Sequence, residues 1–383
     1  MEPIEGDATH WWVTYVWHGG PRVKSVGLVS PQTAWGTLDR LERLPRTKVW
    51  YRTFKVRSDG QGTYMLLPNP PSAVPTDLIG YLSLWRAAKP DPLNPVSFTS
   101  SIDPEFPKGA LGGHHWSILQ LPKAPHHREL EAGPKLPRGT IKEYRIRSRI
   151  LKNTRRLWVY RPAGKEAPSA ATPLVIFFDG FRYMTDGAVP TILDNLIHRK
   201  RIPPTYAVFV DQRDGATRNR ELPAYEPFGR FLVRELVPWI RRTLAFSPSP
   251  NRTVLAGMSY GGLASMHWAS RHPQLFQNVI SQSGSMGFSP PETDEPVALA
   301  RYFMRRPRLP LKIYMDVGRY EARSETENDV GHLGANRHVR DILRVRGYPL
   351  LYREYCGGHD FYCCRQGLVG ALRWTLSLKG SAR

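Results

Sequence analysis

Hydrophobic and polar positions follow two different patterns along this chain, and the change falls near residue 140. Before that point, short runs rich in aromatic and β-branched residues are separated by Gly, Pro, Asp and Ser: WWVTYVW, VKSVGLVS, KVWYRTFKV and TYMLLP. Runs of this length and spacing are typical of short antiparallel strands. We therefore predict β structure across residues 11–85, arranged as a small sandwich.

A stretch rich in proline and glycine separates the two patterns. It begins with AAKPDPLNP (87–95), whose prolines neither a helix nor a central strand would tolerate, and it continues to about Gly139. The domain boundary should fall inside this stretch. We expect a β-sandwich domain over residues 1–121, a linker over 122–139 and a second domain over 140–383.

The second domain alternates strand and helix patterns. TIKEYRIRSRI and TRRLWVYRP alternate as edge strands do, whereas PLVIFFDG is a continuous apolar run, as in a strand buried on both faces. Apolar spacing predicts helices in VPTILDNLIHRK and in residues 228–244. Such alternation predicts a largely parallel sheet with helices on both faces. Further strands are predicted at 206–215, 252–257, 278–285, 311–318 and 350–358.

One short pattern in this domain suggests a nucleophile. Ser259 lies between Gly257 and Gly261 in a G-x-S-x-G sequence, which on its own occurs often by chance. Here a predicted strand precedes it and a predicted helix, ending near His272, follows it. That context is the strand–turn–helix elbow that exposes a reactive serine hydroxyl. The N–H of Tyr260 would then face a developing oxyanion, and Phe181 in FFDGFRYM, or its neighbour Gly180, would supply the second N–H.

A serine nucleophile needs a base and an acid, which in this fold follow it along the chain in the order acid, histidine. His359 follows two glycines at the end of the last predicted strand, where sites in open α/β sheets lie. Asp316 and Glu321 both qualify as the acid. Asp316 lies within the strand end and could be a buried structural carboxylate, so we favour Glu321, whose loop position suits an imidazole partner.

Composition narrows the setting of this site. We expect no membrane span or secretory signal, because long apolar runs are absent and the opening residues MEPIEGDATHWW are polar. Three cysteines, Cys356, Cys363 and Cys364, form no disulfide framework and fit a reducing cytoplasm. The net charge of +21 comes mostly from scattered arginines without a nucleic-acid-binding motif. It reflects either composition alone or a field that attracts a polyanionic small substrate, and we expect no nucleic-acid partner.

Taken together, these stretches resemble the enterochelin (ferric enterobactin) esterase family over nearly the whole chain. The N-terminal part resembles that family's β-domain in VWYRTF and DPLNP. The remainder resembles its hydrolase part in LKNTRRLWVY, PLVIFFDG, RNREL, GMSYGGLAS, ISQSGS and GGHDFYCCR. The chain departs from the family pattern after Gly180, at Cys364 and Gln366, and between Glu321 and His338.

The resemblance implies an α/β hydrolase preceded by a small all-β sandwich. It implies a cytoplasmic serine esterase that cuts the trilactone or related esters of catecholate siderophores, with Ser259 as nucleophile, His359 as base and Glu321 as acid. Arg218, in RNREL, is implied as a substrate-binding residue. No cofactor and no resident metal are expected, because the iron arrives within the anionic substrate. The resemblance leaves the oligomeric state open.

Two other kinds of function remain open from the residues alone. The same Ser-His-Glu set could serve an esterase or acyl transferase acting on another ester, for example in a biosynthetic cluster. The chain could also be a binding protein with an inactive site. An intact Ser259, Glu321 and His359 argue against the second alternative.

Overall fold

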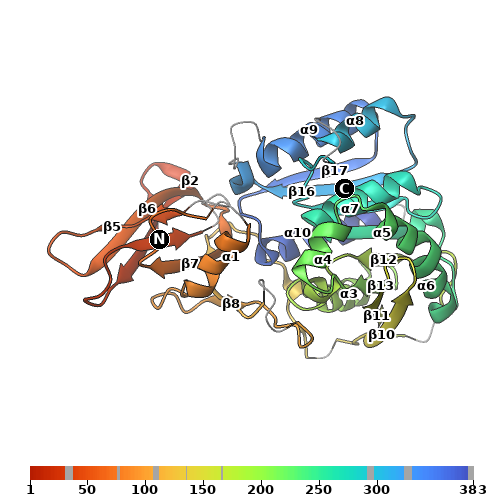
Figure 1. Cartoon of the computed structure of the whole chain (residues 1–383), viewed down its shortest axis with the longest axis horizontal. Helices are drawn as coiled ribbons and strands as arrows, with labels where there is room; N and C mark the ends of the chain where they lie inside the picture. Colours follow the sequence, from red (N-terminus) through yellow and green to blue (C-terminus); the bar gives the residue numbers. More distant parts are fainter. Residues whose placement is uncertain are drawn as a thin grey trace. The chain divides into compact units, whose positions relative to one another are not determined.

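The computed structural model of the 383-residue chain describes residues 1–30, 38–75, 78–106, 112–134, 136–164, 167–290, 297–322 and 330–377. The chain forms two compact units (Figure 1). We call the first the sandwich unit; it comprises Met1–His126, Gly318–Leu333 and Glu354–Cys363. The second, the α/β unit, comprises His127–Val317, Gly334–Arg353 and Cys364–Arg383. No helix in the described ranges is both long and apolar enough to cross a membrane.

Two antiparallel sheets make up most of the sandwich unit, in the strand orders β1-β2-β6-β5 and β4-β3-β7-β9-β8. Side chains from both sheets, among them Val13, Trp50, Leu28 and Leu66, form one buried core. Period-two alternation therefore gives a sandwich, as predicted. The strands are β1 Glu2–Ile4, β2 Asp7–His18, β3 Val26–Val29, β4 Asp39–Arg40, β5 Glu42–Arg43, β6 Val49–Arg57, β7 Gln61–Pro68, β8 Ser97–Thr99 and β9 His115–Gln120.

The prediction of β structure up to residue 85 is wrong at its end. Leu78–Ala87 is the helix α1, drawn in orange in Figure 1. Its sequence, LIGYLSLWRA, contains a single β-branched residue and several strong helix formers. Leu84 packs with Leu67 of β7 in a small buried cluster, so the helix gains a contact with the sandwich that local sequence does not reveal.

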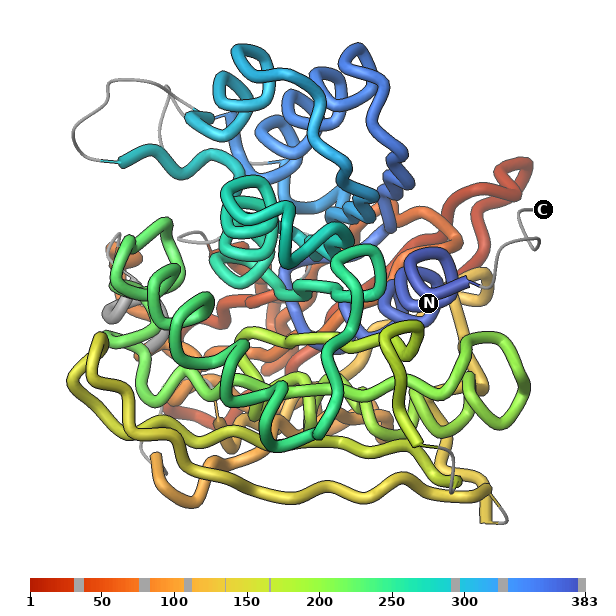
Figure 2. Tube along the Cα trace, turned by 90° about the vertical axis from the view of Figure 1, so that its right-hand side faces the viewer, coloured from red at the N-terminus to blue at the C-terminus, as the bar shows by residue number. Residues whose placement is uncertain are grey.

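The sheet of the α/β unit has, in the described ranges, the order β10-β11-β13-β12-β14-β15-β16-β17. The strands from β13 to β16 pair in parallel, and the antiparallel hairpin β10–β11 lies at one edge, where Figure 2 shows it in yellow. The alternating pattern of these two segments predicted this position. The strands are β10 Thr140–Ser148, β11 Asn153–Arg161, β12 Leu174–Phe177, β13 Tyr206–Val210, β14 Thr253–Met258, β15 Asn278–Gln282, β16 Lys312–Gly318 and β17 Leu350–Tyr355.

Helices cover both faces of this sheet, which explains the continuous apolar run of β12. Ile176 belongs to the main buried cluster, whereas the next residue, Phe177, points the opposite way, and its ring centroid lies 4.9 Å from that of Tyr183 in a tilted arrangement. The fold class predicted from the sequence, an α/β hydrolase preceded by a β-sandwich, is confirmed. The helices are α2 Gly180–Met184, α3 Val189–His198, α4 Gly215–Glu221, α5 Glu226–Phe231, α6 Val237–Leu244, α7 Tyr260–Arg271, α8 Ala298–Arg305, α9 Gly331–Val345 and α10 Phe361–Leu376.

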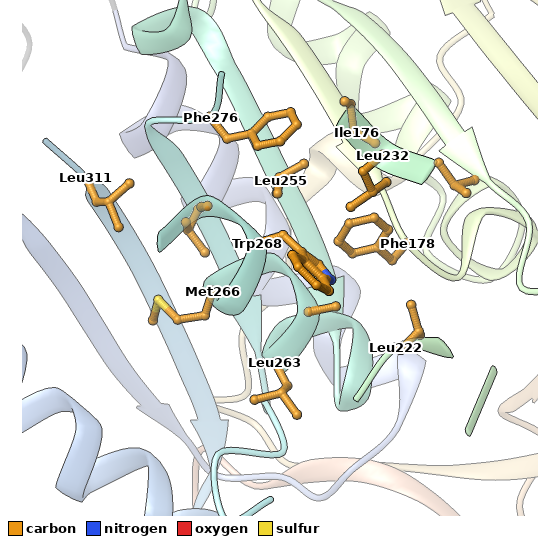
Figure 3. Packing of buried hydrophobic residues seen from close by; sticks show 14 of the residues in the cluster. Ile176, Phe178, Leu222, Leu232, Leu255, Leu263, Met266, Trp268, Phe276 and Leu311 are labelled. Carbon is orange, nitrogen blue, oxygen red and sulfur yellow. The ribbon is translucent and has the colours of Figure 1, made fainter. Parts of the chain in front are cut away.

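Helix α7 is held against the sheet by the largest buried side chain of the core. Trp268 is 1% exposed and lies near Leu255 of β14 and Phe178, which follows β12 (Figure 3). Burial of aromatic groups of this size contributes strongly to packing. Because the first residue of α7 is Tyr260, this packing also fixes the backbone that presents Ser259.

Candidate active site

Ser259 occupies a strained turn between β14 and α7. Its backbone angles are φ 59° and ψ −123°, which are rarely adopted by a residue with a side chain. The Ser259 N–H donates to the Gln282 carbonyl at 3.0 Å, which ties the turn to β15. A Cβ on Gly257 would lie 2.3 Å from the backbone of Gly261, so a glycine is required there. Strain of this kind, held by the surrounding structure, is typical of functional sites.

A second serine lies beside the first. The hydroxyl oxygens of Ser259 and Ser285 are 3.2 Å apart, and the Ser285 N–H donates to the Ser259 carbonyl at 3.0 Å. Sequence reasoning did not single out Ser285, although it belongs to the quoted ISQSGS stretch. A hydroxyl at this distance can hold the Ser259 side chain in one rotamer before reaction.

The loop after β12 is the predicted source of the second oxyanion donor. Asp179 has a left-handed backbone conformation, with φ 55°, and α2 begins at Gly180. A Cβ on Gly180 would lie 2.5 Å from the Phe209 carbonyl carbon, so only glycine fits between this loop and β13. The N–H groups of Phe181 and Tyr260 belong to the first turns of α2 and α7, where helical backbone leaves amide hydrogens unused. Their role as oxyanion donors stays a prediction.

Arg218 joins this loop to the serine turn. Its Nε and Nη2 each donate to Asp179 at 2.7 Å, and Nη2 also donates to the Met258 carbonyl at 3.4 Å. Its guanidinium carbon lies 5.7 Å from the centre of the Tyr260 ring. Burial acts to lower the pKa of Arg218, but the charge of Asp179 and its hydrogen bonds outweigh burial and raise that pKa. Its predicted contact with substrate stays a prediction.

Glu321 and His359 form a close pair within the sandwich unit. Glu321 Oε2 lies 2.6 Å from His359 Nδ1, and Glu321 Oε1 accepts the Gly318 N–H at 2.7 Å. Their side chains are 3% and 10% exposed. A carboxylate on Nδ1 favours the tautomer with its hydrogen there, in which Nε2 carries the lone pair that can accept a proton. This is the arrangement that a general base requires.

The other candidate acid, Asp316, has different partners. It is 1% exposed, and its Oδ2 accepts hydrogen bonds from Tyr314 Oη at 3.0 Å and from Gln282 Nε2 at 3.2 Å. These bonds fix a buried carboxylate inside the α/β unit. The geometry matches the structural alternative considered for Asp316.

His332, which the sequence analysis did not single out, lies beside His359. It lies near the start of α9, and its ring stacks on that of His359, with centroids 5.0 Å apart and planes 4° from parallel. The adjacent residues 323–329, part of the segment that departs from the family pattern, lie outside the described residues. Within the described ranges no cluster of three or more His, Cys, Asp or Glu side chains is arranged to hold a metal ion.

Comparison with known families agrees with both parts of the fold. Residues 148–375 match the family model described as putative esterase. Residues 12–130 match the model described as enterochelin esterase, N-terminal. The two matches together cover the sandwich strands from within β2 to β9 and the α/β unit's strands from β11 to β17.

Individual relatives extend over most of the chain. The iron(III) enterobactin esterase of Dickeya dadantii is 31% identical and is matched over 88% of this chain and 79% of its own length. The iron(III) salmochelin esterase of Escherichia coli is 26% identical, over 97% and 89%.

Solved structures agree. The enterobactin esterase of Shigella flexneri, crystallised in the presence of enterobactin, aligns with a TM-score of 0.75 at 27% identity over 97% of this chain and 94% of that one. The ferric enterobactin esterase of Salmonella typhimurium aligns with a TM-score of 0.77 at 25% identity, over 97% of each chain. The resemblance identified from the motifs is confirmed, and the chain belongs to the enterobactin esterase family of carboxylic ester hydrolases.

Proposed function

We propose that this chain hydrolyses ester bonds in a ferric catecholate siderophore, of the kind formed by a triserine trilactone, and so frees the iron. Relatives named iron(III) enterobactin and iron(III) salmochelin esterase support the substrate class. The observation that carries the catalytic part is the 2.6 Å contact between Glu321 Oε2 and His359 Nδ1. An oriented imidazole is of use to an esterase only with a nucleophile, and the strained Ser259 is the candidate.

In the proposed first half-reaction, the Ser259 hydroxyl oxygen forms a bond to the ester carbonyl carbon while His359 Nε2 takes its proton. The negatively charged oxygen of the tetrahedral intermediate accepts hydrogen bonds from the N–H groups of Tyr260 and Phe181. Glu321 stabilises the imidazolium and keeps its ring in place without itself taking the proton. Collapse breaks the ester C–O bond, and the leaving serine hydroxyl of the substrate receives the proton from His359.

The second half-reaction repeats these roles with water. His359 Nε2 takes a proton from a water molecule whose oxygen attacks the acyl-enzyme carbonyl. The intermediate then breaks its bond to Ser259 Oγ, which recovers a proton from His359. The carboxylic acid of a catecholoyl-serine and the free enzyme result, and iron is carried throughout as part of the substrate.

Charge supports an anionic substrate. Arg218 uses Nε and Nη2 for Asp179, so Nη1 is the nitrogen with no partner among the residues that the structure describes. We propose that Nη1 meets a catecholate oxygen. Planar guanidinium groups also suit the flat rings of such ligands. We further propose a cytoplasmic location, because all three cysteines are buried thiols outside any disulfide, as suits a reducing compartment.

The proposal is tested by mass spectrometry of products from ferric catecholate trilactones and from simple aryl esters. We expect linear catecholoyl-serine products from the trilactone, and a kcat/KM that falls with salt because screening over about 10 Å at 0.1 M weakens attraction of an anion. The neutral aryl ester should respond little to salt. Cleavage of aryl esters with an intact trilactone would instead favour an esterase for another ester.

A further inference from the structure

The loop that carries His359 is bonded to the β-sandwich rather than left as a free connection. It runs from the end of β17 to the start of α10, and residues Glu354–Cys363 belong to the sandwich unit. The N–H of Gln61, the first residue of β7, donates to the Cys356 carbonyl at 2.8 Å. The Cys363 Sγ lies 3.6 Å from the Gln61 carbonyl on the other side of the loop. Strand β7 therefore contacts the loop before the histidine and the first turn of α10 after it.

Asp360, the residue next to His359, makes the most direct of these connections. Its Oδ2 accepts both the Thr63 N–H at 3.1 Å and the Thr63 hydroxyl at 3.2 Å. Its Oδ1 accepts the Cys363 N–H at 2.6 Å, which caps the first turn of α10. One carboxylate thus bonds in two directions, to a helix and to a strand that lies 297 residues away along the chain.

Neighbouring residues strengthen the same attachment. The Tyr362 hydroxyl donates to Gln120 Oε1 of β9 at 3.2 Å. On the acid side, Tyr320 precedes Glu321, packs against the sandwich core and donates its N–H to the Gly357 carbonyl at 3.2 Å. The segments that carry the base and the acid are therefore both attached to the sandwich.

We propose that Asp360 and Thr63 are positioning residues for the general base, and that the β-sandwich thereby contributes to ester cleavage itself. The inference rests on the proposed role of His359. Hydrogen bonds to Thr63 fix the backbone next to His359, and so fix the direction in which Nδ1 meets Glu321 and Nε2 meets the nucleophile. A shift of about 1 Å in such a group costs on the order of 100-fold in rate. Supporting bonds of this kind are required wherever a reacting group sits on a loop.

The charge state of Asp360 fits this role. Burial raises the pKa of its carboxyl, while the hydrogen bonds from Cys363 and Thr63 act in the opposite direction. These hydrogen bonds therefore stabilise the ionised form of Asp360. We expect loss of the Thr63 hydroxyl to displace the loop that carries His359.

The test uses two substitutions in the full-length chain, each of which removes one partner. Thr63→Val keeps the shape and the N–H of the residue but deletes the hydroxyl donor. Asp360→Ser keeps a good cap for α10 but is too short to reach Thr63. Ser117→Ala is the matched control, because Ser117 is buried in the same sandwich and bonds Asp91 rather than the loop. It should weaken the fold without moving His359.

Turnover of a small neutral aryl ester and the rate of Ser259 labelling by a fluorophosphonate are then measured on folded protein. We expect kcat to fall about tenfold for Thr63→Val and up to about 100-fold for Asp360→Ser, with KM nearly unchanged and labelling slowed in parallel. The Nδ1 proton resonance of His359 should shift or broaden in both variants. The double variant should lose no more than Asp360→Ser alone, since both changes remove one contact.

The outcomes separate this inference from the proposed function. Activity retained in His359→Ala would overturn the role of the base itself. An inactive His359→Ala together with full kcat in Thr63→Val and Asp360→Ser would overturn only the positioning role. Should Asp360→Ser fail to fold, Thr63→Val decides the question alone. Equal losses in Ser117→Ala and Thr63→Val would reduce the effect to general stability and would also overturn it.

Discussion

The imidazole of His332 lies flat against that of His359, with ring centroids 5.0 Å apart. The contact covers one face of the proposed base and limits rotation of its ring. Ring stacking of this type contributes about 1 kcal/mol. His332→Ala should therefore lower kcat on a small aryl ester about fivefold, through a less well oriented His359.

His332→Phe provides the matched comparison, because a flat ring replaces a flat ring without any titratable group. It should keep kcat within about twofold of the parent chain. Steady-state kinetics on both variants at one pH measure the difference. If Ala and Phe behave alike, the stack has no part in orienting the base.

Ser259→Ala should abolish turnover and fluorophosphonate labelling while the fold and the affinity for a ferric catecholate remain. The hydroxyl forms the covalent bond, whereas recognition uses other groups. We expect residual activity below about one part in a thousand. Ser285→Ala is the control at the neighbouring hydroxyl, and it should retain labelling of Ser259. Labelling that moves to another residue in Ser259→Ala would point to a different nucleophile.

Glu321→Gln should reduce kcat by roughly 10⁴-fold, because an amide cannot stabilise the imidazolium and holds the wrong tautomer. Asp316→Asn changes the second candidate acid in the same way. There we expect reduced thermal stability, from altered bonds to Tyr314 and Gln282, with kcat per folded molecule nearly unchanged. Kinetics and thermal melts on both variants give the order. The reverse order would make Asp316 the acid.

The buried His267 should make the free energy of unfolding depend on pH. Burial, with smaller effects of Arg271 and His272, lowers the pKa of His267 from 6.5 to about 4. Between these values the unfolded chain binds a proton that the folded chain excludes. Stability should therefore be full above about pH 6.5 and decline as the pH falls toward 4, by up to about 3 kcal/mol from this residue.

His267→Gln removes this titration and should flatten the free energy of unfolding across that window. Burial also lowers the pKa of His272, so part of the decline should persist. Urea unfolding at a series of pH values measures the slope. An unchanged slope in His267→Gln would show that other groups control acid stability.

The sequence predicts the fold well where the signals are local. The sandwich strands and the parallel sheet follow from period-two runs and from PLVIFFDG, whose neighbours on both sides are buried. The turn at Ser259 is recognisable because a side chain at Gly257 would clash with the backbone of Gly261, only four residues later. Helix α1 is missed because its contact with Leu67 lies outside any local window.

Contacts between distant residues explain what the sequence leaves out at the site. Chain order, loop position and the family resemblance together nominated Glu321 and His359, and their catalytic roles stay predictions. The stack of His332 on His359 depends on how α9 begins, which no motif encodes. Arg218 carried an expected role toward substrate, but its ion pair with Asp179 cannot be read from RNREL. Contacts of this kind become visible only once the sheet has brought distant segments together.

The bond between Asp360 and Thr63 also limits how genes of this kind can recombine. A crossover in the proline-rich stretch would exchange the first 120 or so residues as one linear block. The two bonded residues would then come from different parents. Hybrids should stay active when both parents carry the same pair, and lose activity when they do not. Inheritance at these two positions is therefore coupled across nearly the whole length of the chain.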